Sequence, residues 1–176
     1  MKTLYTGEDF ARLPLEGPYE LVRGELRALT PPGFEHGEIA SNVAFVLKSF
    51  TRRVGWGRVT VESGFYTRRA PDSVRGPDVA LWADREGSPT GFSLTPPLVA
   101  VEVVSPKDAS EEVEEKVQEY LAAGVLRVWI LYPRTQTMHV YAPEGVCQVY
   151  GIDSAVEVDP LLPGFACQLG EFFGQL

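Results

Sequence analysis

One carboxylate stands in the middle of an almost unbroken apolar run, Pro97–Ser105, whose sequence is PLVAVEVVS. The run is short, rich in valine and bounded by prolines, which is typical of a strand buried on both faces of a sheet. An ionised glutamate at this depth is strongly destabilising unless a cation, a metal ion or strong hydrogen-bond donors meet it. Glu102 therefore predicts an ion-paired or functional site inside the sheet.

A second carboxylate, Asp78, follows Gly76-Pro77 and opens the apolar run Val79–Trp82. Two carboxylates brought together on neighbouring buried strands supply the hard oxygen ligands that a divalent metal ion needs. Simpler interpretations stay open at this point. Glu102 could pair with an arginine, and Asp78 could only end a turn after Pro77.

The length and composition predict a globular protein with one domain over residues 1–176. The chain has 44% hydrophobic and 23% charged residues, enough for a sizeable core. It contains two cysteines and two histidines, and the cysteines stand twenty positions apart. We expect reduced thiols and no zinc site built from Cys and His.

Charge and hydropathy limit the kinds of partner, membrane or nucleic acid, that this chain could bind. The apolar runs are too short to cross a bilayer and the N-terminal residues lack an apolar signal core, so we expect a cytoplasmic protein with no membrane partner. The net charge of −8 argues against a large electrostatic footprint on nucleic acid. Six arginines lie between positions 52 and 75, so a local basic patch is still compatible with the acidic total charge.

The pattern of apolar residues predicts an α/β or α+β fold with one mixed central sheet. We expect a hairpin over 19–29, a long helix over 36–53, and strands over 58–68, 79–82, 98–104 and 128–132, followed by a hairpin over 138–150. A helix from Asp108 to Gly124 separates two of these strands, so it predicts a right-handed parallel crossover.

The crossover helix carries the third candidate residue. Asp108 and Glu111 have the spacing of a capping box, and Gly124 is a stop signal. Lys116 lies about 40° from Tyr120 around this helix, at the edge of the buried stripe. It can bury its stem and direct its ammonium group toward the sheet. The alternative is an exposed ion pair with Glu112, four residues earlier.

These motifs together resemble a known family. Pro77-Asp78, Val101–Pro106 and Lys116-x-x-x-Tyr120 are similar to the Uma2 family of restriction-endonuclease-like proteins, which belongs to the PD-(D/E)xK nuclease superfamily. The resemblance extends over roughly residues 19–141. The superfamily pattern has a lysine two residues after the acidic strand residue, where this chain has Val104. In Uma2-like sequences the lysine lies on the following helix, which here means Lys116.

The resemblance implies a restriction-endonuclease-like core and metal-assisted hydrolysis of DNA phosphodiester bonds. Asp78 and Glu102, with the carbonyl of Val103, would hold Mg²⁺ or Mn²⁺. Lys116 would position or deprotonate the attacking water or offset charge in the transition state. The remaining candidates are Glu20 as an extra acid, His36 as a base or phosphate contact, and Tyr120 as a hydrogen-bond donor.

Structural alternatives accompany these roles. Tyr120 could be core packing, and His36 could simply lie at a helix end. A nuclease-fold binding or assembly module with weak or no catalysis is the second functional hypothesis. We also expect a homo-oligomer, a dimer or higher. The apolar residues that could supply its interface, or instead pack in the interior, are Phe165, Leu169, Phe172 and Phe173.

Overall fold

The computed structural model describes residues 3–83, 91–106, 108–145, 147–157 and 160–175. Its centre is a mixed six-stranded sheet with the order β10-β9-β8-β7-β6-β3. The strands are β3 (Arg58–Val61), β6 (Val79–Trp82), β7 (Val99–Val103), β8 (Arg127–Tyr132), β9 (Thr137–Tyr141) and β10 (Cys147–Tyr150). Only β7 and β8 run parallel, and the other neighbouring pairs are antiparallel.

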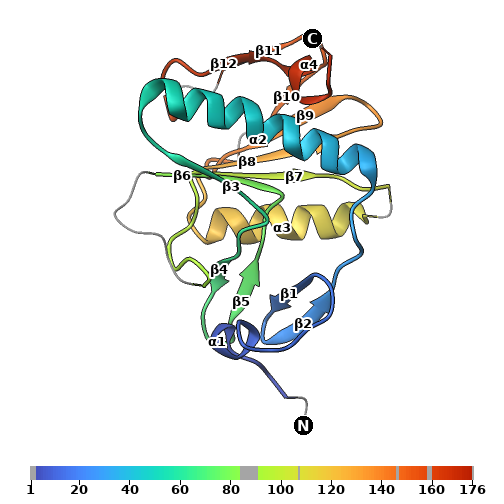
Figure 1. Cartoon of the computed structure of the whole chain (residues 1–176), viewed down its shortest axis with the longest axis vertical. Helices are drawn as coiled ribbons and strands as arrows, with labels where there is room; N and C mark the ends of the chain where they lie inside the picture. Colours follow the sequence, from blue (N-terminus) through green and yellow to red (C-terminus); the bar gives the residue numbers. More distant parts are fainter. Residues whose placement is uncertain (1–2, 84–90, 107, 146, 158–159, 176) are drawn as a thin grey trace.

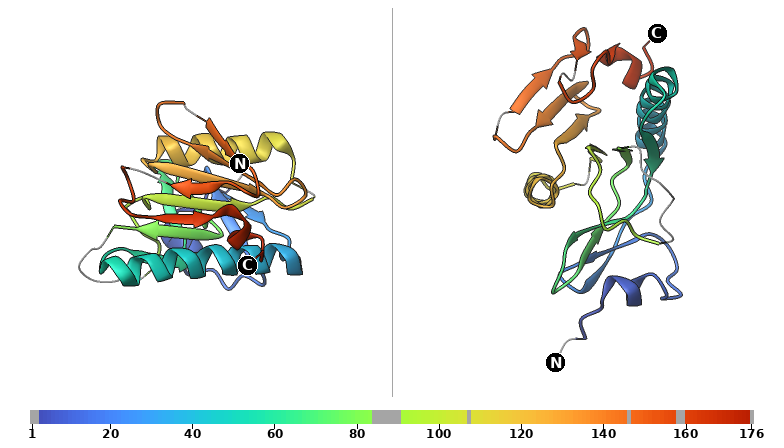
Figure 2. Two further views of the ribbon diagram at one scale, coloured as in Figure 1. Left: turned by 90° about the horizontal axis from the view of Figure 1, so that it is seen from above. Right: turned by 90° about the vertical axis from the view of Figure 1, so that its left-hand side faces the viewer.

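Two long helices cover opposite faces of this sheet, α2 (Phe34–Val54) and α3 (Ser110–Ala122) (Figures 1 and 2). The alternation of side chains along β7 explains the division. Val99, Val101 and Val103 join the core beneath α2, whereas Ala100 joins the core beneath α3. The parallel arrangement expected for this crossover is confirmed, because α3 connects the parallel strands β7 and β8.

A second, antiparallel sheet lies beyond α3, with the order β2-β1-β5-β4 (Figure 1). It contains β1 (Tyr19–Val22), β2 (Glu25–Ala28), β4 (Phe65–Arg68) and β5 (Ser73–Arg75). The short helix α1 (Gly7–Phe10) precedes it. At the C-terminal end, β11 (Ala155–Glu157) pairs with β12 (Ala166–Gln168), and α4 (Leu169–Phe172) follows.

The expected single strand over 58–68 is wrong, because the structure divides it between the two sheets. β3 is an edge strand of the six-stranded sheet, whereas β4 belongs to the four-stranded sheet. The break falls at Glu62, whose φ of 51° lies in the left-handed region and ends the extended backbone. The alternating pattern continued across the break and therefore concealed it.

The predicted capping box at Asp108 is also wrong. The residue at the N-cap of α3 is Ala109, and its side chain makes no capping hydrogen bond. The Asp108 carboxylate instead accepts a hydrogen bond of 2.8 Å from the Ser105 backbone N–H, which closes the turn between β7 and α3. Gly124 does follow the helix, with a φ of 100° that favours glycine.

The C-terminal apolar residues pack inside the molecule. Phe165, Leu169 and Phe172 belong to the same core as α2, and Phe173 packs against that core. They supply the interior rather than a subunit interface, and the homo-oligomer stays a prediction. Cys167 is a free, buried thiol, and the side chain of Cys147 lies outside the described residues. Among the described helices, none combines the length and hydropathy needed to span a membrane.

We expect Leu47→Ala to destabilise the protein by about 2–5 kcal/mol, because it opens a cavity between α2 and the six-stranded sheet. Urea denaturation followed by circular dichroism measures this change in the free energy of unfolding. The neighbouring Lys48 is exposed, so Lys48→Ala should stay within about 0.5 kcal/mol of the wild type. Equal losses in the two variants would contradict the assigned face of α2.

Candidate active site

Asp78 joins three elements at one end of the six-stranded sheet. It precedes β6, and its Oδ2 accepts a hydrogen bond of 2.7 Å from the Val103 backbone N–H at the end of β7. The same oxygen lies 3.1 Å from Nε2 of His36, in the first turn of α2. The pairing of β6 with β7 ends at Val79 opposite Val101, so Val103 projects past the start of β6 and meets this carboxylate. Asp78 therefore does more than end a turn.

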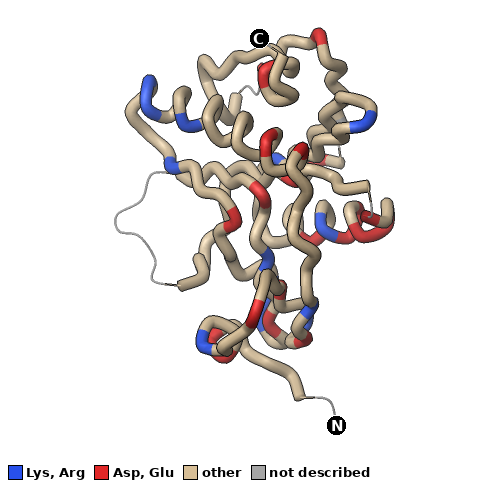
Figure 3. The backbone as a smooth tube through the Cα atoms, turned by 45° about the vertical axis from the view of Figure 1, so that its right-hand side comes forward, with Lys and Arg blue, Asp and Glu red and all other residues tan. Residues whose placement is uncertain are grey.

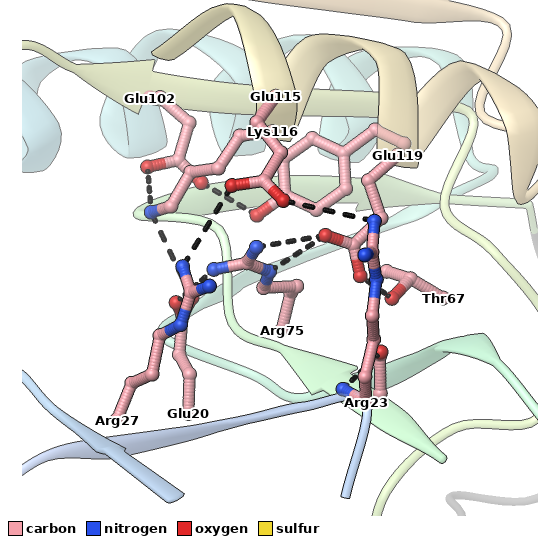
Figure 4. Close-up of polar contacts among 11 residues, drawn as sticks. Glu20, Arg23, Arg27, Thr67, Arg75, Glu102, Glu115, Lys116 and Glu119 are labelled. Carbon is pink, nitrogen blue, oxygen red and sulfur yellow. Dashed lines mark hydrogen bonds and ion pairs between the residues drawn. The ribbon is translucent and has the colours of Figure 1, made fainter. Parts of the chain in front are cut away.

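Glu102 lies on the α3 side of β7, on the same face as Ala100. Its Oε2 lies 3.0 Å from Nζ of Lys116 (Figure 4). Its Oε1 accepts a hydrogen bond of 2.6 Å from the hydroxyl of Tyr120. Lys116 and Tyr120 are four residues apart on α3, so one helical face presents both groups to one carboxylate. The cation that meets Glu102 is thus a lysine rather than an arginine.

Burial raises the pKa of Glu102 to about 7, and the charge of Lys116 only partly offsets this effect. Asp78 and Glu20 raise the pKa of Glu102 further, because neighbouring negative charges oppose its ionisation. Burial opposes the positive charge of Lys116, but Glu102 and Glu20 outweigh it and raise the pKa of the lysine above its usual range. The site is therefore short of positive charge around Glu102.

Glu20 connects the second sheet to this cluster. It is buried on β1, and its Oε2 lies 2.7 Å from Nη1 of Arg75. Its Oε1 lies 3.7 Å from Nζ of Lys116 and makes no hydrogen bond. Lys116 thus stands between a carboxylate from each sheet, Glu102 and Glu20 (Figure 4). The alternative of an exposed pair between Lys116 and Glu112 is wrong.

Arg75, on β5, is the main residue of the cluster that the sequence did not reveal. Its Nε and Nη2 donate to one oxygen of Glu119 on α3, at 3.0 and 2.8 Å, and Thr67 donates to the other oxygen. Sequence reasoning counted Arg75 among six arginines that could form a basic patch, but its guanidinium is buried between two carboxylates. The one available signal was its position three residues before Asp78.

Asp78 and His36 form a second part of the candidate site. The hydrogen bond to Asp78 raises the pKa of His36, while partial burial opposes that rise. Nδ1 of His36 is buried and has no hydrogen-bond partner. A pocket of about 240 Å³ beside this pair is lined by both residues and by Val61 and Glu62 of the β3 segment. It gives solvent-sized molecules access to Asp78.

Every residue predicted for the site lies in one of these two connected groups. Glu102, Lys116, Tyr120 and Glu20 form the first, and Asp78 and His36 form the second. The two groups are connected through the backbone. Glu102 of the first group is followed in the chain by Val103, whose N–H donates a hydrogen bond to Asp78 of the second group. Tyr120 is fully buried in the core, as the packing alternative predicted, and its hydroxyl also donates a hydrogen bond to Glu102.

The donor set fits a small, hydrated divalent cation. Asp78 and Glu102 offer carboxylate oxygens, and Val103 offers a main-chain carbonyl at the end of its strand. Across the part of the chain that the structure describes, no group of three or more His, Cys, Asp or Glu side chains is arranged to hold a metal ion. Mg²⁺ nevertheless commonly uses only one or two carboxylates and keeps several waters.

We expect Arg75→Met to destabilise the protein by about 3–5 kcal/mol, because it leaves Glu20 and Glu119 without their buried cation. Urea denaturation measures the loss. The matched control is Arg23→Met, which removes an arginine that is 66% exposed and lies 3.9 Å from Glu115. That variant should lose no more than about 1 kcal/mol. A small effect of Arg75→Met would show that the two carboxylates do not depend on the guanidinium.

Comparisons with known proteins identify the family and the fold of the chain. A family model described as "Uma2: Putative restriction endonuclease" matches residues 8–170. No curated protein matches the chain. The crystal structure of "a putative nuclease belonging to DUF820" from Anabaena variabilis ATCC 29413 matches with a TM-score of 0.81 and 22% identity, over 97% of this chain and 98% of that one, and establishes the fold. Because the family model covers nearly the whole sequence and every residue of the candidate site, the chain belongs to the Uma2 family.

Proposed function

We propose that this protein is a metal-dependent endonuclease that hydrolyses phosphodiester bonds of DNA. The observation that carries the proposal is the buried Glu102, which has Lys116 at 3.0 Å and still retains a raised pKa. A purely structural ion pair would not need a further carboxylate, Asp78, close enough to oppose its ionisation. Membership of a family described as restriction endonucleases supports the same reaction class.

Asp78 and Glu102, with the carbonyl of Val103, would hold Mg²⁺ or Mn²⁺. When bound, such a cation supplies positive charge to the phosphate and acidifies a water molecule. Asp78 is oriented for this role by the Val103 N–H and by His36, which leaves its other oxygen for the cation. Tyr120 fixes the rotation of the Glu102 carboxylate through its short hydrogen bond.

Lys116 would serve the reacting phosphate or the attacking water. Its ammonium group is held between Glu102 and Glu20, and its side chain remains 25% exposed, so substrate can reach it. With its pKa raised, Lys116 stays protonated at neutral pH and offsets negative charge that develops on the phosphate. His36, beside Asp78 and lining the small pocket, is the candidate base or phosphate contact.

The second candidate function is a binding or assembly module with weak or no catalysis. One observation favours it: both oxygens of Glu102 and one oxygen of Asp78 are already satisfied by protein groups. In this case the same contacts would stabilise the fold and would not exchange for a metal ion. Cleavage and metal binding separate the two functions.

We expect the wild-type protein to nick plasmid DNA with Mn²⁺ or Mg²⁺ and to be inactive with EDTA. Glu102→Gln and Lys116→Gln should each lower the rate by at least about 100-fold, because they remove a metal ligand and the cation that stabilises the transition state. Agarose gels give the rates, and circular dichroism establishes that each variant is folded.

The matched control is Glu114→Gln, which neutralises an exposed acid on the same helix. It should retain the wild-type rate. Cleavage that survives both site substitutions would contradict the assignment of the site. Absence of cleavage by the folded wild type, together with no stabilisation by metal, would favour the binding module.

We further expect the apparent affinity for Mg²⁺ to rise about tenfold from pH 6 to pH 8, since a proton on Glu102 competes with the cation. With a pKa of about 7, Glu102 is mostly protonated at the lower pH and mostly ionised at the higher one. Titrations of the melting temperature against Mg²⁺ at both pH values measure the change. Glu102→Gln should weaken this dependence and leave only the part that His36 contributes beside Asp78. A pH-independent wild-type affinity would contradict the assigned ligand.

A further inference from the structure

A larger pocket extends around the edge strand β3, from the C-terminal part of α2 to residues between 91 and 96. Its volume is about 740 Å³, which is the size of many small-molecule sites. Among the described residues, its lining combines three aromatic side chains with three cations. They are Trp56, Trp82, Phe92, Lys48, Arg52 and Arg58. We call this site the aromatic pocket.

The described residues that line the aromatic pocket carry positive charge, whereas the chain as a whole is acidic. The chain carries a net charge of −8, yet the described residues that line the pocket include no aspartate or glutamate. Lys48 and Arg52 are exposed at the same end of α2, where Figure 3 also shows basic positions. This concentration of positive charge on an acidic protein indicates an anionic ligand.

The two tryptophan rings of the aromatic pocket are held in place before any ligand arrives. Nε1 of Trp82 donates a hydrogen bond of 2.8 Å to the hydroxyl of Thr60 on β3. Trp56 packs edge-on against Phe50 of α2 with ring centroids 6.4 Å apart. Both rings are only partly buried. Fixed aromatic faces beside cations are the features with which proteins bind unpaired nucleic-acid bases.

The aromatic pocket adjoins the small pocket at Asp78. Ala44 lines the small pocket and Lys48, one helical turn later, lines the aromatic pocket. On the other wall, Val61 and Glu62 line the small pocket between Thr60 and Ser63 of the larger one. Asp78 and Trp82 stand at opposite ends of β6, which puts them about 13 Å apart at the usual rise of a strand.

We propose that the aromatic pocket binds an unpaired nucleotide of the DNA strand whose phosphate lies at the Asp78–Glu102 site. This inference rests on the proposed endonuclease function and adds a substrate class, DNA with a single-stranded segment beside the cut. Bases within a duplex are stacked on each other and cannot present a face to Trp56 or Trp82. An unpaired base enters the pocket while its phosphates meet Lys48 and Arg52.

The test is direct binding in EDTA, where no cleavage occurs. We expect a fluorescent single-stranded oligonucleotide to bind at least about fivefold more tightly than a blunt hairpin duplex of equal length. Binding should quench tryptophan fluorescence. Trp129 is fully buried, so Trp56→Phe and Trp82→Phe, which keep an aromatic ring, should each reduce the quench.

Charge variants supply the matched control. Lys48→Gln and Arg52→Gln should each weaken single-strand binding, and each should reduce the slope of log affinity against log salt by about one. Arg134→Gln removes an exposed cation after β8 and should change neither quantity. All three positions are exposed, so loss of folding does not confuse the comparison.

Equal affinity for the single strand and the hairpin, or equal slopes in all three charge variants, would overturn the inference. A protein that nicks plasmid DNA without preferring single strands would refute the aromatic pocket alone. A protein that binds single strands through Lys48 and Arg52 but cuts nothing would support the pocket and refute the endonuclease.

Discussion

The structure depends on one largely buried ion pair, Glu102 with Lys116, because it joins a central strand of the main sheet, β7, to the helix that covers it, α3. Removing either partner would leave the other charge without its nearest counter-charge in a largely buried position. Lys116 also reaches Glu20, and Glu20 in turn meets Arg75, so the pair extends into the second sheet. The relative position of the two sheets and the geometry of the candidate site are therefore set by the same contacts.

The sequence was most informative where a residue broke the pattern around it. A lone glutamate in a valine-rich strand identified the site, and the offset of Lys116 from Tyr120 identified the helix face that meets it. The role of Arg75 in the cluster was not predicted, because no local sequence pattern distinguishes a buried arginine from an exposed one. Its carboxylate partners, Glu20 and Glu119, are distant in the sequence. The break between β3 and β4 at Glu62 was not predicted either, because one residue with a left-handed backbone does not interrupt an alternating sequence pattern.

The two adjoining pockets differ in chemistry. The small one holds the carboxylate and imidazole of Asp78 and His36, whereas the aromatic pocket holds cations and rings. Under the proposed function, the residues at the Asp78 end of β6 act on a phosphate, and those at the Trp82 end bind the DNA strand. An acidic protein can therefore handle a polyanion without a basic surface overall.

The chain of buried charges described above has a consequence for ion selection. Glu20, Glu102, Glu119 and Asp78 meet two permanent cations, Lys116 and Arg75, and Asp78 also meets His36. When His36 is neutral and Glu102 is ionised, two negative charges remain unbalanced. Burial is the main cause of the raised pKa of Glu102, and the neighbouring carboxylates of Asp78 and Glu20 add to it. Under the proposed function, one divalent ion would neutralise the cluster, whereas a monovalent ion would leave a deficit and a trivalent ion an excess. The ion-pair network that stabilises the fold would thus discriminate among ions by valence before any ligand geometry does.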